Sequence, residues 1–153
     1  MSVSCSRRQL LRTGVVSSVL TACSRQTLAD GDAAIVQPAA PGAPAFVERA
    51  FEMRQLAVDK GDQPYGAIIV RDNVIVGQSW SRVVLDQDPT GHAEVSAIRD
   101  AARRLNSRRL GGTVMYSSSR PCPMCEAAAY WAGVESLVYG RNADDAGAPQ
   151  LCR

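Results

Sequence analysis

Aromatic residues, histidine and long apolar runs are scarce in this chain. Only 5% of the 153 residues are aromatic, and His92 is the only histidine. No stretch is long enough to form a helix that spans a bilayer. The hydrophobic share of 46% and the charged share of 21% are ordinary for a globular protein, which excludes a wholly disordered chain. The length is sufficient for one domain with a core of its own.

A strong charge of either sign is also lacking, and the small basic excess lies at one end. The net charge is +2, but residues 1–22 contain three arginines and no acidic residue. Residues 23–153 therefore carry 14 basic and 15 acidic groups, a net charge of −1. A domain so close to neutral gives no global electrostatic argument for binding nucleic acid, so no nucleic-acid partner is expected.

The first 29 residues have the organisation of an export signal. Arg7 and Arg8 precede two leucines and a short apolar run over residues 13–22. The arginine pair resembles the twin-arginine signal, and Leu-Thr-Ala-Cys ending at Cys23 resembles a bacterial lipobox. A lipid on Cys23 would tether the protein to a membrane; the alternative is an ordinary signal cleaved after Ala29. We therefore expect an exported protein, either periplasmic or membrane-tethered on the outer side.

A change of composition marks the boundary between this signal and a folded domain. Residues 30–45 are rich in alanine and proline, which favours an extended spacer. From Phe46 onward the apolar residues become periodic, so the sequence predicts a folded domain over residues 46–153. The three predicted regions are an export signal (1–29), a Pro/Ala-rich linker (30–45) and this domain.

Apolar periodicity and turn residues predict an alternation of helices and strands in the domain. The later β-α-β order favours a parallel pair of strands, whereas the Asp72-Asn73 turn favours an antiparallel hairpin. The predicted fold class is therefore α/β, a three-layer α-β-α sandwich with a mixed central sheet. The expected elements are a helix at 46–61, strands at 65–70 and 74–76, a loop at 81–91, a helix at 92–105, a strand at 113–117, a helix at 121–131 and a strand at 134–139.

Two short motifs place metal-binding side chains at the starts of two predicted helices. His92 and Glu94 open one helix, and Pro121-Cys122-x-x-Cys125 opens another. Cysteines at positions i and i+3 share a helix face, and the first turn of a helix favours the thiolate form. One imidazole and two thiolates give Zn²⁺ three protein ligands and an open fourth position, which is typical of a catalytic site. Glu94 is then placed to move protons rather than to hold the metal.

The pair of motifs resembles the signature H-x-E…P-C-x-x-C of zinc-dependent nucleobase deaminases. The chain is similar to the cytidine deaminase-like superfamily over residues 46–147, particularly to bacterial guanine deaminases and tRNA adenosine deaminases. The Asp-Pro-Thr at 88–90, the Pro-Tyr-Gly-Ala at 64–67 and the Ala-Tyr-Trp-Ala at 129–132 look most like guanine deaminases. The resemblance implies Zn²⁺ as the cofactor, Glu94 as the catalytic residue and a homodimer as the assembly.

The resemblance also implies where the substrate is contacted, and here the chain departs from its relatives. They usually carry Asn where this chain has Ser81, Ala where it has Gly91, and Glu where it has Arg120. Ser81, Gly91 and Trp131 are the implied substrate contacts. Guanine deaminases continue past the equivalent of Arg153 with a segment that helps to close the site. Cys152 is left over as a free thiol, an intermolecular disulfide or a fourth zinc ligand.

Each motif residue also has a simpler interpretation. Cys122 and Cys125 have the spacing of a redox pair, although that role leaves His92 and Glu94 unexplained. Glu94 by itself would complement the dipole of its helix, and Tyr130 and Trp131 would pack in a core. The arginines at 99, 103, 104, 108 and 109 would complement the carboxyl end of a solvated helix.

Three functions fit these residues. The first is zinc-dependent hydrolytic deamination of a purine base or nucleoside, guanine being favoured, with release of ammonia. The second is a tRNA adenosine deaminase-like enzyme, against which export and the near-neutral charge argue. The third is a catalytically inactive, zinc-stabilised exported binding protein, because a fold alone does not establish an activity.

Overall fold

The structure is a computed structural model that describes residues 34–151. The predicted export signal, Cys23, the first part of the predicted linker and Cys152 lie outside these residues. The described elements are α1 (Ala43–Asp59), β1 (Gly66–Arg71), β2 (Val74–Trp80), α2 (Ala93–Arg104), β3 (Thr113–Ser117), α3 (Pro123–Ala132), β4 (Ser136–Tyr139) and β5 (Asp144–Gly147). No helix among residues 34–151 is long and apolar enough to cross a membrane.

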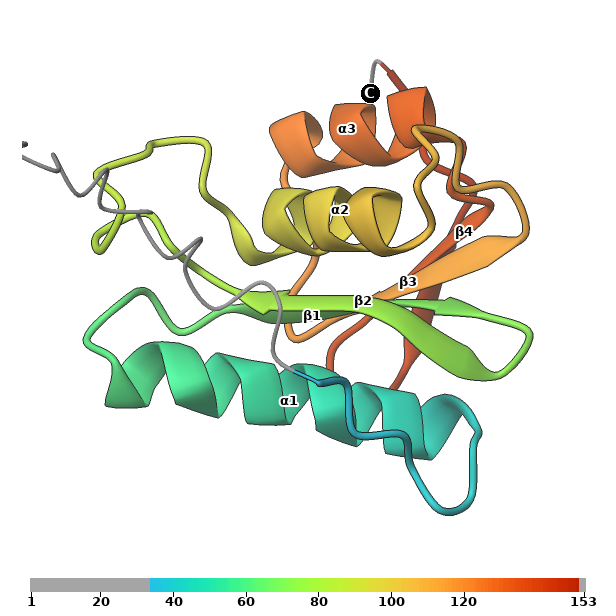
Figure 1. Cartoon of the computed structure of the whole chain (residues 1–153), viewed down its shortest axis with the longest axis horizontal. Coiled ribbons are helices and arrows are strands. Elements are labelled where there is room, and N and C mark those ends of the chain that lie inside the picture. The colour runs from blue at the N-terminus through green and yellow to red at the C-terminus, as the bar shows by residue number, and fades with distance from the viewer. Residues whose placement is uncertain (1–33, 152–153) are drawn as a thin grey trace, which may run out of the picture.

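A five-stranded mixed sheet forms the middle layer of the protein. Its strand order is β2-β1-β3-β4-β5. β3 and β4 are parallel, whereas the pairs β1–β2, β1–β3 and β4–β5 are antiparallel. Helix α1 covers one face of the sheet, and α2 and α3 lie together on the other (Figure 1). The predicted three-layer sandwich with a mixed sheet is confirmed.

The first helix and the last strand differ most from the sequence-based expectation. The first helix begins at Ala43, within the predicted linker, because Pro44 suits the first turn of a helix. The residues just before it also contact the sheet: the Gln37 side chain donates to the carbonyl of Ile75 and accepts from its N–H, both at 2.8 Å. The chain from Gln37 onward therefore belongs to the folded unit, and Gln37 pairs with the outer edge of β2 as a neighbouring strand would.

The second difference is β5, which the sequence did not predict. Asp144–Gly147 contains no β-branched or aromatic residue, so its composition gives no strand signal. Its pairing comes instead from the return of the chain after β4, where Val138 lies opposite Asp145 and Tyr139 lies opposite Asp144.

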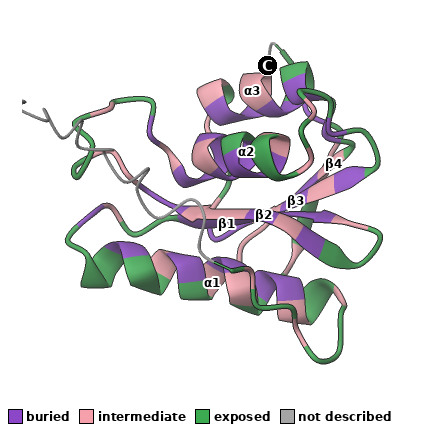
Figure 2. Ribbon diagram, viewed as in Figure 1, coloured by how far each residue is buried: buried purple, intermediate pink, exposed green. Residues whose placement is uncertain are grey.

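Buried residues line both faces of the sheet and the helix faces turned toward it (Figure 2), and the two layers contain side chains of different size. The layer beneath α1 is built from large side chains: Phe46, Met53, Ile68, Val70, Ile75 and Trp80, with Ala57. The layer between the sheet and α2 and α3 is rich in alanine: Ala67, Ala93, Ala97, Ala101, Ala129 and Ala132, with Ile69, Ile98, Leu110, Met115, Val134 and Leu137. Small side chains let two helices approach the sheet closely.

Close approach is most evident where α2 crosses β2. A Cβ atom built on Gly77 would lie 2.6 Å from the backbone nitrogen and the Cβ of Ala101, so only glycine fits there. Beside this contact the buried Asp100 carboxylate accepts the Gln78 N–H at 3.0 Å and a guanidinium N–H of Arg104 at 2.9 Å. These contacts hold the carboxyl-terminal half of α2 against β2.

Candidate metal centre

The amino ends of α2 and α3 lie next to each other on one side of the sheet (Figure 1). His92 is the N-cap residue of α2, and Cys122 is the N-cap residue of α3, with Cys125 in the first turn. Helix α3 begins at Pro123, two residues later than expected, because Cys122 has an extended backbone conformation. Two segments some 30 residues apart in sequence thus present their ligand side chains to one point.

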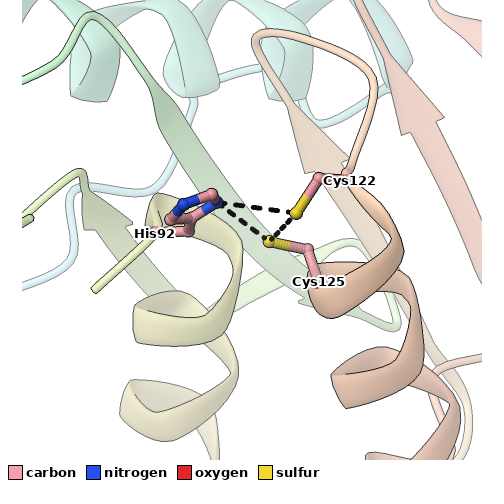
Figure 3. Close-up of side chains that lie close together, drawn as sticks. All are labelled: His92, Cys122 and Cys125. Carbon is pink, nitrogen blue, oxygen red and sulfur yellow. Dashed lines mark hydrogen bonds between the residues drawn. The ribbon is translucent and has the colours of Figure 1, made fainter. Parts of the chain in front are cut away.

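The three side chains converge on a common space (Figure 3). His92 Nδ1 lies 3.7 Å from Cys122 Sγ and 3.5 Å from Cys125 Sγ, and the two sulfur atoms are 3.6 Å apart. Tetrahedral zinc, with bonds of about 2.3 Å to sulfur and about 2.0 Å to nitrogen, separates its ligand atoms by roughly 3.5–3.8 Å. The donor set and its spacing therefore fit zinc, and among residues 34–151 the set has three ligands, which leaves a fourth position open.

Glu94 lies beside this cluster without being part of the three-residue set. The side chain is only 5% exposed, and its Oε2 accepts the Cys125 thiol at 3.4 Å. Burial raises the pKa of the Glu94 carboxyl, and hydrogen bonds from its own backbone N–H and from Cys125 offset this only in part. A carboxyl group whose pKa is raised exchanges protons closer to neutral pH, which is what a proton shuttle needs.

The surroundings of Cys125 favour its neutral thiol. Burial raises the pKa of the Cys125 thiol, and the nearby Glu94 and Cys122 raise it further. Without a cation this thiol therefore stays protonated, and a Zn²⁺ ion bound here would displace the proton and stabilise the thiolate. Both thiols are free, with their sulfur atoms much farther apart than the roughly 2.05 Å of a disulfide.

The three implied substrate contacts are in different surroundings. Ser81 is fully buried at 0% exposure, and its hydroxyl donates to Asp62 Oδ1 at 2.8 Å. Gly91 is buried directly before His92, at the end of the predicted loop. Trp131 is 73% exposed near the carboxyl end of α3, whereas the cysteines are at its amino end. The structure brings Gly91 next to the cluster but does not bring Trp131 to it, and Ser81 already has a partner within the chain.

Sequence reasoning missed Asp62, which turns out to organise the loop before His92. It is a lone aspartate between Gly61 and Gln63, and no motif distinguishes it from a solvated turn residue. Its partner Ser81 was singled out only as a possible substrate contact. The one available signal was that position 81 is atypical for the family, which indicates a changed partner but does not identify it.

Arg120 carries a positive charge at a position where the resemblance led us to expect an acidic residue. It borders a cavity of about 350 Å³ on the outer side of the first turn of α3. The remaining lining residues are Pro121, Pro123, Glu126, Gln150 and Leu151. Glu126 in that wall is buried and accepts the Gln150 N–H at 3.1 Å. The segment that follows β5 is thereby held against α3, next to the metal ligands.

The arginines on and after α2 form ion pairs with acidic neighbours. Arg103 and Arg104 both contact the buried Asp100, at 3.3 and 2.9 Å. Arg99 lies 3.7 Å from Asp88. These ion pairs compensate the charge of three of the five arginines within the protein.

Known proteins similar to this chain are deaminases. The chain is 39% identical over 102 residues to guanine deaminase of Bacillus subtilis (strain 168), covering 66% of this chain and 65% of that protein. It is 37% identical over 94 residues to a tRNA-specific adenosine deaminase of Aquifex aeolicus (strain VF5), covering 61% and 62%. The match thus spans less than two thirds of the length of either relative.

The fold comparison agrees with the sequence comparison. The solved structure of guanine deaminase from Bacillus subtilis matches with a TM-score of 0.61 at 39% identity, covering 63% of this chain and 62% of that one. The family described as the cytidine and deoxycytidylate deaminase zinc-binding region matches residues 43–141, from the first residue of α1 to just beyond β4. Because that stretch holds the whole cluster and most of the chain, the protein belongs to this zinc-binding deaminase family.

Proposed function

We propose that this protein catalyses zinc-dependent hydrolytic deamination of a purine base or nucleoside, with guanine as the favoured substrate. The observation that supports this most directly is the open set of His92, Cys122 and Cys125 with the buried Glu94 beside it. A closed structural zinc site would need a fourth protein ligand and would have no use for an adjacent carboxyl group.

In this reaction the oxygen of water bonds to the ring carbon that bears the amino group, the carbon–nitrogen bond breaks and ammonia leaves. Zinc, when bound to the three ligands, would lower the pKa of water toward neutral pH. Glu94 accepts the proton from water and returns it to the leaving amine, so the carboxylate ends the cycle in its starting form. Its burial excludes bulk water, which would otherwise exchange the same proton.

Guanine is favoured because of the similarity to guanine deaminase, and tRNA adenosine is the second candidate. The two relatives differ by only two percentage points in identity to this chain. The near-neutral charge of residues 23–153 favours a small molecule, since proteins that bind RNA usually carry a basic surface. Base and nucleoside share the ring carbon that reacts, so the site residues serve either.

Release of ammonia tests this proposal. Purified, zinc-loaded protein is assayed with guanine, adenine, cytosine and their nucleosides, and with an adenosine-containing tRNA anticodon stem-loop. We expect release from guanine. Release from the stem-loop alone would replace the purine-base assignment by RNA editing. A fully zinc-loaded protein that is inert on the whole panel would contradict the deaminase proposal and favour the binding protein.

Export and assembly are further proposals that rest on the sequence. The arginine pair predicts transport of a folded domain, so Arg7→Lys with Arg8→Lys should retain the protein inside the cell. Cys23→Ala should release the exported protein from membranes if a lipid is attached there. Unchanged fractionation of either variant contradicts the corresponding signal.

The expected homodimer is tested by sedimentation, and the exposed Tyr130 and Trp131 provide apolar surface for it.

A further inference from the structure

The loop between β2 and α2 determines where the histidine ligand lies. It begins at Ser81, directly after β2, and its last residue, Gly91, precedes His92. The Arg82 N–H donates to the Gly91 carbonyl at 2.8 Å, so the two ends of the loop are joined by a backbone hydrogen bond. A Cβ atom on Gly91 would lie 3.2 Å from the Arg82 carbonyl oxygen, which shows how tightly these ends pack.

One carboxylate, contributed by the turn after α1, holds the first part of this loop. Asp62 is 8% exposed and accepts four hydrogen bonds. They come from the Ser81 hydroxyl at 2.8 Å, the Gln63 N–H at 2.7 Å, and the N–H groups of Val84 and Leu85 at 3.0 Å each. Three of the four donors belong to the loop.

The ionisation state of Asp62 agrees with this role. Burial acts to raise the pKa of Asp62, but the hydrogen bonds from Leu85, Ser81, Gln63 and Val84 outweigh it, so the pKa lies below its usual value. The group is therefore an anion at neutral pH, and hydrogen bonds to an ionised acceptor are stronger than neutral ones. Such a contact fixes a loop more firmly than a neutral amide would.

These contacts form a continuous chain from Asp62 to the metal centre. Asp62 holds Ser81 and the turn at residues 84–85, Arg82 between them binds Gly91, and Gly91 is covalently joined to His92. Each link is short, and the one between Asp62 and Ser81 is buried. A shift of the loop would therefore be transmitted to the imidazole, whose Nδ1 must stay within bonding range of the same point as the two sulfur atoms.

We propose that Asp62 and Ser81 form a positioning pair that holds the loop so that His92 meets the two cysteines at the metal centre. Residue 81 therefore acts on the loop and not on the substrate. The proposal rests on the proposed zinc site, but it does not require that guanine, or any base, is the substrate. Ligand-orienting groups of this kind typically change metal affinity or activity by about 10–100-fold when they are removed.

The direct test is Asp62→Asn, which keeps the size of the side chain but removes its charge. The amide NH2 then faces either the N–H groups of Val84 and Leu85 or the Ser81 hydroxyl and the Gln63 N–H. A hydroxyl can turn to accept but a backbone N–H cannot, so at least one backbone hydrogen bond is lost, and the remaining ones lose their ionised acceptor. We expect zinc affinity, measured by competition with a chelating dye, to fall by about 10–100-fold. We also expect the visible spectrum of the Co²⁺-substituted protein to change, because that spectrum reports the geometry of the ligand set.

Asp100→Asn is the matched control. Asp100 is a second buried carboxylate, 2% exposed, which also binds a backbone N–H, but it lies in the last two turns of α2, away from the metal centre. It should lower thermal stability while leaving zinc affinity and the Co²⁺ spectrum as in the wild type. A purely structural role for Asp62 would give both variants the same result.

Ser81→Ala provides a milder variant in case Asp62→Asn does not fold. Loss of one hydrogen bond should weaken zinc binding several-fold and lower kcat with little change in KM. A raised KM with unchanged zinc affinity would show that Ser81 contacts the substrate and would overturn the proposal. Wild-type zinc affinity and Co²⁺ spectrum in Asp62→Asn would overturn it as well. A zinc-loaded but inert wild type would contradict only the deaminase function, since these metal readouts need no turnover.

Discussion

The two faces of the sheet differ in the size of their buried side chains and in what those side chains contribute. Under α1, large residues such as Phe46 and Met53 bury apolar area and touch no ligand of the metal centre. Under α2 and α3, alanines and Gly77 let the helices approach closely enough for His92 and the two cysteines to meet. We infer that the α1 face contributes mainly to the stability of the fold, whereas packing on the other face sets the positions of the three metal-binding side chains. Substitutions on the first face should affect folding alone, and substitutions on the second should also affect the metal.

The largest expected effect is on the ligand face and comes from Cys125→Ala. The variant removes one of three ligands, and because zinc binding is coupled to folding, we expect loss of zinc and a marked fall in melting temperature. Metal content by mass spectrometry and calorimetry measure the two effects. A variant that still holds one zinc per chain would mean that Cys125 is not a ligand and that the comparison of the faces is wrong.

On the α1 face, Phe46→Ala should cost about 3–5 kcal/mol of unfolding free energy, because it removes a large, fully buried ring. We expect the folded protein to keep wild-type zinc affinity, since Phe46 packs on the opposite side of the sheet. Urea unfolding of the zinc-loaded protein and a chelator competition assay check the two statements. Weakened zinc binding in folded Phe46→Ala would show that the two faces are not independent.

Gly77→Ala tests the close approach on the ligand face. The added Cβ overlaps Ala101, so we expect a loss of about 1–3 kcal/mol together with weaker zinc binding as α2 moves. The control is Gly111→Ala, because no atom lies within 4 Å of a Cβ built there. Should Gly77→Ala destabilise the fold and leave zinc affinity untouched, the packing of α2 does not set the ligand geometry.

Asp62, in the turn after α1, holds the loop that leads to His92. Its contribution to the free energy of unfolding should depend on pH. Because its pKa is lowered in the folded state, its stabilisation is complete above the usual aspartate pKa of about 3.9 and is lost as pH falls through the folded value. The stability difference between wild type and Asp62→Asn should therefore be constant near neutrality and shrink in acid. Unfolding curves between about pH 3 and pH 7 measure it, and a difference that grows in acid would contradict the assignment.

The convergence of His92, Cys122 and Cys125 could be predicted from the sequence because these residues belong to short, local motifs. His92 with Glu94, and Cys122 with Cys125, each lie within one helical turn, and the alternation of helices and strands placed both motifs at helix starts. Contacts between distant segments were not predictable. Asp62 precedes Ser81 by 19 residues, and the carboxylate carries no signal beyond its identity. Likewise, β5 depends on pairing rather than on the propensity of its residues.

Comparison of wild type with Glu94→Gln tests the central claim most directly. Glutamine keeps the size of the side chain but cannot take a proton from water, whereas all three ligands remain. The account predicts one zinc per chain in both proteins and ammonia release from guanine that is about 10²–10⁴-fold slower in the variant. Equal rates of release by the two zinc-loaded proteins would contradict the assignment of Glu94 as the group that moves the proton.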